Sequence, residues 1–70
     1  MERVPLNSRS VASVGYEPSK GVLEIEFRSG EVYEYFLVPE SAFSELLDAP
    51  SAGEYVSNQV RGRYPYRRVR

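Results

Sequence analysis

Hydrophobic and polar side chains alternate along three stretches in the N-terminal half of the chain. In the clearest one, VLEIEFR, the apolar residues Leu23, Ile25 and Phe27 fall on one face and charged residues fall on the other. The stretches SVASVGYE and EVYEYFLVP follow the same period of two. Alternation of this kind is typical of strands that bury one face and expose the other. The pattern predicts three β-strands.

The second turn between these stretches allows two registers. A two-residue loop of Ser29 and Gly30 would place Ile25 opposite Glu34, with a carboxylate on the apolar face. A three-residue loop with Gly30 in the left-handed conformation would instead place Ile25 opposite Tyr33. We favour the longer loop because it unites six large apolar side chains on one face. These are Leu23, Ile25, Phe27, Tyr33, Tyr35 and Leu37.

The first turn predicts the same buried face. A four-residue loop at residues 18–21 contains proline and glycine, and it sets Tyr16 opposite Leu23. Two independent turns therefore agree on one register. The cost of this register is that Glu24 lies opposite Glu34, a mildly unfavourable pair of like charges.

Beyond residue 38 the apolar period changes to that of a helix. Pro39 suits a first helical position, Ser51 and Glu54 form a capping box, and Gly62 is a left-handed stop. The two apolar stripes consist of Ala42, Phe43, Leu46 and Leu47, and of Ala52, Tyr55, Val56 and Val60. The expected fold class is α+β: a three-stranded antiparallel β-meander followed by two short helices packed on one face, in the order β-β-β-α-α.

Length and composition limit the chemistry. Seventy residues make one small domain, for which we expect a core over residues 8–66 and a basic tail at 67–70 that could be flexible. Without cysteine or histidine there is no disulfide, thiolate ligand or imidazole ligand, so we expect no metal and no cofactor. No apolar run approaches the roughly 20 residues that span a bilayer, and the N-terminus lacks a signal-peptide core, so we expect a cytoplasmic protein with no membrane partner.

Charge is strongly segregated behind a net value of −1. The first 54 residues hold all ten carboxylates and four cations, whereas the last sixteen hold five arginines and no acid. Arginine pairs with phosphate and stacks on bases, and tyrosine offers a stacking surface. The segment RGRYPYRRVR therefore suggests nucleic-acid binding. The candidate residues are Arg61, Arg63, Tyr64, Tyr66, Arg67 and Arg68.

A plainer interpretation of the same segment is that Tyr64 and Tyr66 fold back over the apolar face while the arginines neutralise the acidic body. The pair Tyr33 and Tyr35 has two interpretations as well. It could form a base-stacking platform, or it could belong to the core beneath the helices, which the three-residue loop favours.

The carboxylates Glu24, Glu26 and Glu34 share the predicted outer face, where solvation is more plausible than acid–base work or cation binding. No glycine-rich phosphate loop exists, and the serines near the N-terminus have no base partner. We interpret the chain as a non-enzyme.

The segments SVASVGYE, LEIEF, SGEVYEYFLVP, SAGEYV and RGRYPYRR, over residues 8–68, resemble the KTSC domain family. That family is named for the C-terminal extension of some lysyl-tRNA synthetases and also contains stand-alone bacterial proteins. The resemblance implies a role in RNA binding, through attachment to a tRNA-charging enzyme, and it supplies no active-site residues.

The leading hypothesis is therefore a small non-catalytic binding module, with RNA or a ribonucleoprotein as partner. The alternative is a protein–protein adaptor that uses the edges of its short sheet.

Overall fold

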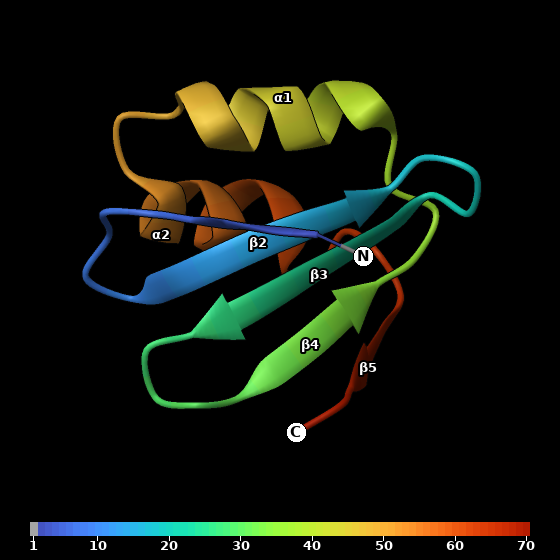
Figure 1. The fold of residues 1–70 in the computed structure, drawn as a ribbon. Helices are drawn as coiled ribbons and strands as arrows, with labels where there is room; N and C mark the ends of the chain where they lie inside the picture. The colour runs from blue at the N-terminus through green and yellow to red at the C-terminus, as the bar shows by residue number, and fades with distance from the viewer. Residues whose placement is uncertain (1) are drawn as a thin grey trace.

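A computed structural model describes residues 2–70 as one antiparallel sheet with helices on one face (Figure 1). The five strands lie side by side in chain order: β1 Arg3–Pro5, β2 Val11–Glu17, β3 Val22–Phe27, β4 Val32–Tyr35 and β5 Tyr66–Arg68. The helices are α1 Glu40–Asp48 and α2 Ala52–Tyr55, and α2 continues into the π-helical turn η1 Val56–Val60. Figure 1 shows the helices near β2, with β4 and β5 farther from them. Within residues 2–70, no helix is long and apolar enough to cross a membrane.

The predicted strand register is confirmed at both turns. Tyr16 pairs with Leu23, and Ile25 pairs with Tyr33. Gly30 adopts a φ of 100°, a left-handed conformation that a residue with a side chain rarely takes. The like-charge pair of Glu24 and Glu34 is also present.

The core lies between β2, β3, β4 and the helices, as the apolar spacing predicts. Leu23 and Ile25 are fully buried, and Leu46 from α1 and Val60 from η1 pack in the same cluster. The two helical segments therefore bury the predicted apolar stripes. The exception is Leu47 of α1, which is 40% exposed.

The helix ends follow local signals. The Ser51 hydroxyl accepts a hydrogen bond from the Glu54 backbone N–H at 3.2 Å, which is half of the predicted capping box. Gly62 has a φ of 76° and ends the second helical segment, as predicted. Pro39 precedes α1 as its N-cap instead of occupying the first helical position.

The prediction of three strands is wrong, because the sheet formed by residues 2–70 has five. The two additional strands, β1 and β5, are three residues long and mostly exposed, and they form the two edges. Neither offers an alternating apolar pattern, and β5 pairs with β4 across about half the chain. Such pairing depends on tertiary contacts and leaves little trace in the local sequence.

Leu37 also departs from the expected buried face. Strand β4 ends at Tyr35, and Leu37 takes a φ of 61° with 77% of its surface exposed. This reversal turns Val38 into the core, where its carbonyl accepts a hydrogen bond from the Tyr16 hydroxyl at 2.5 Å. The chain thereby leaves the sheet and enters α1.

The π-helical turn η1 returns the chain to the sheet. The Arg61 N–H donates to the carbonyl of Val56, five residues earlier, at 2.9 Å. Arg61 is then extended, with φ −68° and ψ 133°, and Gly62 reverses the direction. Such π turns occur often at functional sites. Here the turn delivers Arg61 and then β5 to the free side of β4.

Candidate nucleic-acid interface

The sheet divides the side chains of β5 between two surfaces. We call the helix-bearing side the inner face and the opposite side the outer face. Tyr66 pairs with Tyr35, so both rings lie on the inner face, whereas Arg67 pairs with Glu34 on the outer face. Successive residues of a strand point to opposite faces, so Arg68 returns to the inner one.

Three tyrosines on the inner face form what we call the tyrosine cluster: Tyr33, Tyr35 and Tyr66. Their ring centroids lie 5.6 to 6.2 Å apart, and Phe27 packs edge-on against Tyr33 at 5.7 Å. Tyr35 is only 3% exposed, Tyr33 is half-buried, and Tyr66 is 62% exposed. The core interpretation is thus confirmed for Tyr35, and the cluster presents the Tyr66 ring to solvent.

A small cavity of about 100 Å³, which we call the inner-face cavity, adjoins this cluster. Its lining consists of Phe27, Glu31, Tyr33, Tyr35 and Arg61. Burial raises the pKa of Tyr35, and the nearby positive charge of Arg61 partly opposes that rise. The cavity therefore combines aromatic walls with one cation and one anion.

The two charged groups of this cavity, Arg61 and Glu31, differ in the ion pairs and hydrogen bonds that they make. Within residues 2–70, no ion pair joins Arg61 to a carboxylate. The Glu31 carboxylate lies 3.5 Å from the Arg68 guanidinium and accepts a 3.3 Å hydrogen bond from the Ser29 hydroxyl. Both contacts are long, so Glu31 keeps much of its capacity to accept hydrogen bonds.

The outer face carries a network of ion pairs, which we call the outer-face ladder. The contacts are Arg3–Glu24 at 2.6 Å, Arg3–Glu26 at 3.3 Å, Arg67–Glu34 at 2.9 Å and Arg70–Glu26 at 3.2 Å. The Ser13 hydroxyl also donates to Glu26 at 2.8 Å and is the main cause of a lowered pKa for that carboxyl. Across residues 2–70, no group of three or more acidic side chains could hold a metal ion.

The six predicted binding residues do not form one surface. Arg61, Tyr66 and Arg68 lie on the inner face beside the tyrosine cluster. Arg67 belongs to the outer-face ladder. At the end of η1, Arg63 donates to the Gln59 side chain at 2.8 Å, and Tyr64 is half-buried against the core, as the plainer interpretation of the tail predicted.

Sequence reasoning missed Phe27 and Glu31 as members of a possible site. The apolar alternation places Phe27 in the core and gives Glu31 no role. The favoured hairpin register contained a signal for both, because the Phe27 N–H donates to the Glu31 carbonyl at 2.9 Å across that turn. The position of Arg61 above the same turn depends on η1 and had no such signal.

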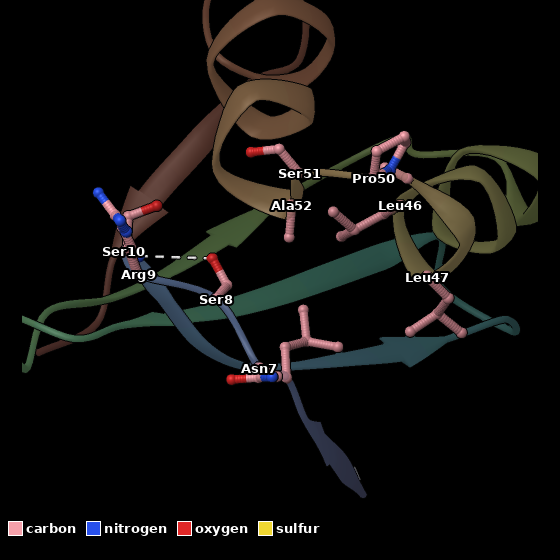
Figure 2. A pocket seen from close by; sticks show the side chains of 11 residues that line it. Asn7, Ser8, Arg9, Ser10, Leu46, Leu47, Pro50, Ser51 and Ala52 are labelled. Carbon is pink, nitrogen blue, oxygen red and sulfur yellow. Dashed lines mark hydrogen bonds between the residues drawn. The ribbon is translucent and has the colours of Figure 1, made fainter.

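A larger groove lies elsewhere, between the β1–β2 connection and the turn from α1 to α2 (Figure 2). It encloses about 430 Å³. Leu46 and Leu47 contribute apolar surface, and Ser8 accepts the Ser10 N–H at 3.4 Å on the opposite wall. None of the six predicted residues lines this groove.

Comparisons with known proteins agree with the fold and the motifs. A sequence model described as the KTSC domain matches residues 7–64. An uncharacterized protein of Stutzerimonas stutzeri is 45% identical over 67 residues, covering 96% of this chain and 93% of that protein. A lysine–tRNA ligase of a Nostoc species is 43% identical over 54 residues, which cover 77% of this chain and 10% of the ligase.

A solved structure extends the agreement to three dimensions. The crystal structure of a KTSC domain protein from Yersinia pestis aligns with a TM-score of 0.93 at 34% identity, covering 99% of this chain and 97% of that one. The sequence match, the full-length relative and this shared fold identify the family. The chain belongs to the KTSC domain family.

Proposed function

We propose that the protein is a small non-catalytic RNA-binding module whose contact surface is the inner face of β4 and β5. One observation carries the proposal: the exposed ring of Tyr66 extends a tyrosine cluster directly beside Arg61, a cation that no carboxylate neutralises within residues 2–70. Aromatic rings on a sheet, flanked by guanidinium groups, are the usual means of binding unpaired bases and their phosphates.

The outer face suits this role less well. Its arginines already contact carboxylates at 2.6 to 3.3 Å, so a phosphate would have to compete with an existing partner. It also gathers Glu24, Glu26 and Glu34, which repel a polyanion. The inner face offers stacking surface and less neutralised charge, which is why we assign RNA to it.

The family supports RNA as the partner. About a tenth of each matched lysine–tRNA ligase consists of the region similar to this chain. Those enzymes are named for a tRNA substrate, and a domain joined to one would act at high local concentration near RNA. The stand-alone relative from Stutzerimonas stutzeri has nearly the length of this chain, so the domain also occurs without the enzyme.

A pair of matched variants tests the proposal. Arg61→Gln and Arg67→Gln remove the same charge from opposite faces, and both residues are exposed. We expect Arg61→Gln to weaken binding of a mixed-sequence single-stranded RNA about tenfold in fluorescence anisotropy, and Arg67→Gln less than about twofold. Tyr66→Ala should weaken it about tenfold through lost stacking.

The salt dependence measures how many cations take part. If Arg61 and Arg68 approach phosphates, the logarithm of the association constant should fall with the logarithm of salt concentration at a slope of about −1.4 for single strands. Equal weakening by both arginine variants would reduce the interaction to general charge attraction. No detectable RNA binding at low salt would reject the proposed function.

A protein partner is the second candidate, favoured by the unpaired edge of β5. Its side chains Arg67 and Arg68 have exposed fractions of 68% and 59%, which discourages pairing with a second copy and suits an acidic extended segment. Chemical-shift changes confined to residues 66–68 on adding an acidic peptide, without any response to RNA, would select this candidate.

A further inference from the structure

We propose that the inner-face cavity recognises a guanine base of single-stranded RNA through Glu31 and Arg61. This inference rests on the proposed function and deepens it, because it assigns a base preference to the same surface. Tyr33 and Tyr35 of the tyrosine cluster line the cavity, so a base held there would lie against rings that Tyr66 also contacts.

The charge pattern of the cavity excludes simpler ligands. Aromatic walls with a carboxylate would suit an organic cation, but Arg61 lines the same space and would repel it. A free anion would meet Glu31. A neutral planar group with donors on one part of its edge and an acceptor on another satisfies both charges, and nucleobases are such groups.

Guanine fits this pair better than the other bases. Its Watson–Crick edge presents two adjacent donors, N1–H and the N2 amino group, beside the O6 acceptor. A carboxylate can accept from both donors at once, and a guanidinium can donate to O6. Adenine presents one donor beside an acceptor on that edge, so one Glu31 oxygen would face a lone pair.

The same chemistry requires an unpaired strand. In a duplex the Watson–Crick edge is occupied by the partner base, and the base faces are covered by neighbours, so neither Glu31 nor Tyr66 could engage them. The present partners of Glu31 do not block the contact. Its side chain is 42% exposed, and its distance to Arg68 is 3.5 Å, longer than a strong charge-assisted hydrogen bond.

Three single-stranded oligonucleotides that differ at one base test the inference on the full chain. Each is a run of uridines with guanosine, adenosine or inosine at the centre, and inosine lacks only the N2 amino group of guanosine. At one fixed low salt concentration we expect guanosine to bind about tenfold more tightly than adenosine, with inosine between them.

Two variants identify the residue responsible. Glu31→Gln keeps the shape of the side chain but replaces one acceptor oxygen with an NH2 donor, which would face a guanine donor, so the ratio of guanosine to adenosine affinity should fall to about one. Glu34→Gln removes the same charge and also loses an arginine contact, but on the outer face, and it should leave that ratio unchanged. The ratio is the readout because either variant raises affinity for any polyanion.

The outcomes separate this inference from the proposed function. Equal binding of all three oligonucleotides would overturn guanine recognition while RNA binding stands. A preference that survives Glu31→Gln, or inosine binding as tightly as guanosine, would overturn the assigned contact. Failure of every oligonucleotide to bind would reject both.

Discussion

The two faces of the sheet beside β4 use the same residue types in different arrangements. On the outer face, Glu34 and Arg67 are direct cross-strand neighbours and contact each other at 2.9 Å. On the inner face, Arg61 comes from the end of a helical turn and Glu31 from a hairpin, and the rings of Tyr33 and Tyr35 line the space between them. The outer charges therefore satisfy one another, and the inner charges line a cavity.

This difference shows why charge counted along the sequence does not locate a binding surface. Tyr66, Arg67 and Arg68 are consecutive, yet the strand sends the first and third to one face and the second to the other. Ion pairs near the surface, such as those of the ladder, contribute about 0 to 1 kcal/mol each and weaken with salt. Their main effect here is to occupy guanidinium groups that an anion would otherwise meet.

The largest expected effect is a loss of folding stability when the buried core beside the sheet is disrupted. Ile25 is fully buried at the centre of β3, between Val14 and Tyr33 in the sheet. Ile25→Ala should lower the free energy of unfolding by about 2–5 kcal/mol, because it leaves a cavity in a small core. Chemical denaturation followed by circular dichroism measures this loss, which should abolish RNA binding as well.

The matched control lies in the same cross-strand row. Val4 pairs with Val14 at the edge strand β1 and is 42% exposed. Val4→Ala also removes methyl groups, but it should cost less than about 0.5 kcal/mol. Similar losses for the two variants would contradict the assignment of the core to β2, β3 and the helices.

Much of the central fold could be predicted because local and long-range signals agree there. Gly30 needed a left-handed turn, and only that turn united Ile25 with Tyr33 on an apolar face. The two helical stripes could be predicted equally well, because each repeats apolar residues at helical spacing. Leu46 of the first stripe and Val60 of the second are both buried. A one-residue error in register would have inverted both faces, so this part of the chain is strongly specified.

The candidate site was harder to predict because it depends on where β5 lies. Nothing in residues 66–68 alternates between apolar and polar, and the strand is held by pairing to β4 and by ring contacts with Tyr33 and Tyr35. The sequence predicts arginine and tyrosine as candidate binding residues. The sequence could not show that Arg67 and Arg68 lie on opposite faces of the sheet, because that follows from strand β5, which the local pattern does not predict.

On the helix side of the sheet, a smaller effect should appear at alkaline pH. Burial, together with a 2.8 Å hydrogen bond to Glu45, raises the pKa of Tyr55 to about 12. In the unfolded chain a tyrosine ionises near pH 10. The stabilisation is therefore complete below about pH 10 and is lost as the pH rises toward 12.

Tyr55→Phe isolates this contribution. At neutral pH the variant should be less stable by about 0.5 kcal/mol, since the bond it loses is partly exposed, and the difference should disappear in alkaline solution. Ultraviolet absorbance follows the phenol directly. Glu45→Gln keeps an acceptor without its charge, so it should bring the Tyr55 midpoint closer to 10. A Tyr55 titration midpoint near 10 in the unmodified protein would contradict the hydrogen bond from the Tyr55 hydroxyl to Glu45.

The smallest expected effect is a loss of folding stability at acidic pH, caused by protonation of Glu26 on the outer face. The Ser13 hydroxyl, followed by the charges of Arg3 and Arg70, holds the pKa of Glu26 below its ordinary value near 4.3. Because the folded value is the lower one, the stabilisation is present above about pH 4.3 and is lost as the pH falls through the folded pKa.

Glu26→Gln should therefore unfold at a slightly lower denaturant concentration than the unmodified protein at neutral pH, and at the same concentration once the pH is below the folded pKa of Glu26. Ser13→Ala removes the main cause of the shift, so the Glu26 carboxyl of that variant should titrate closer to 4.3 in an NMR pH series. Added salt should shrink the neutral-pH difference, since half-exposed ion pairs are screened. Parallel pH profiles for the unmodified protein and Glu26→Gln would mean that the ladder contributes nothing to folding. In that case its arginines would be as available to a phosphate as Arg61, and the distinction between the two faces would rest on the tyrosine cluster alone.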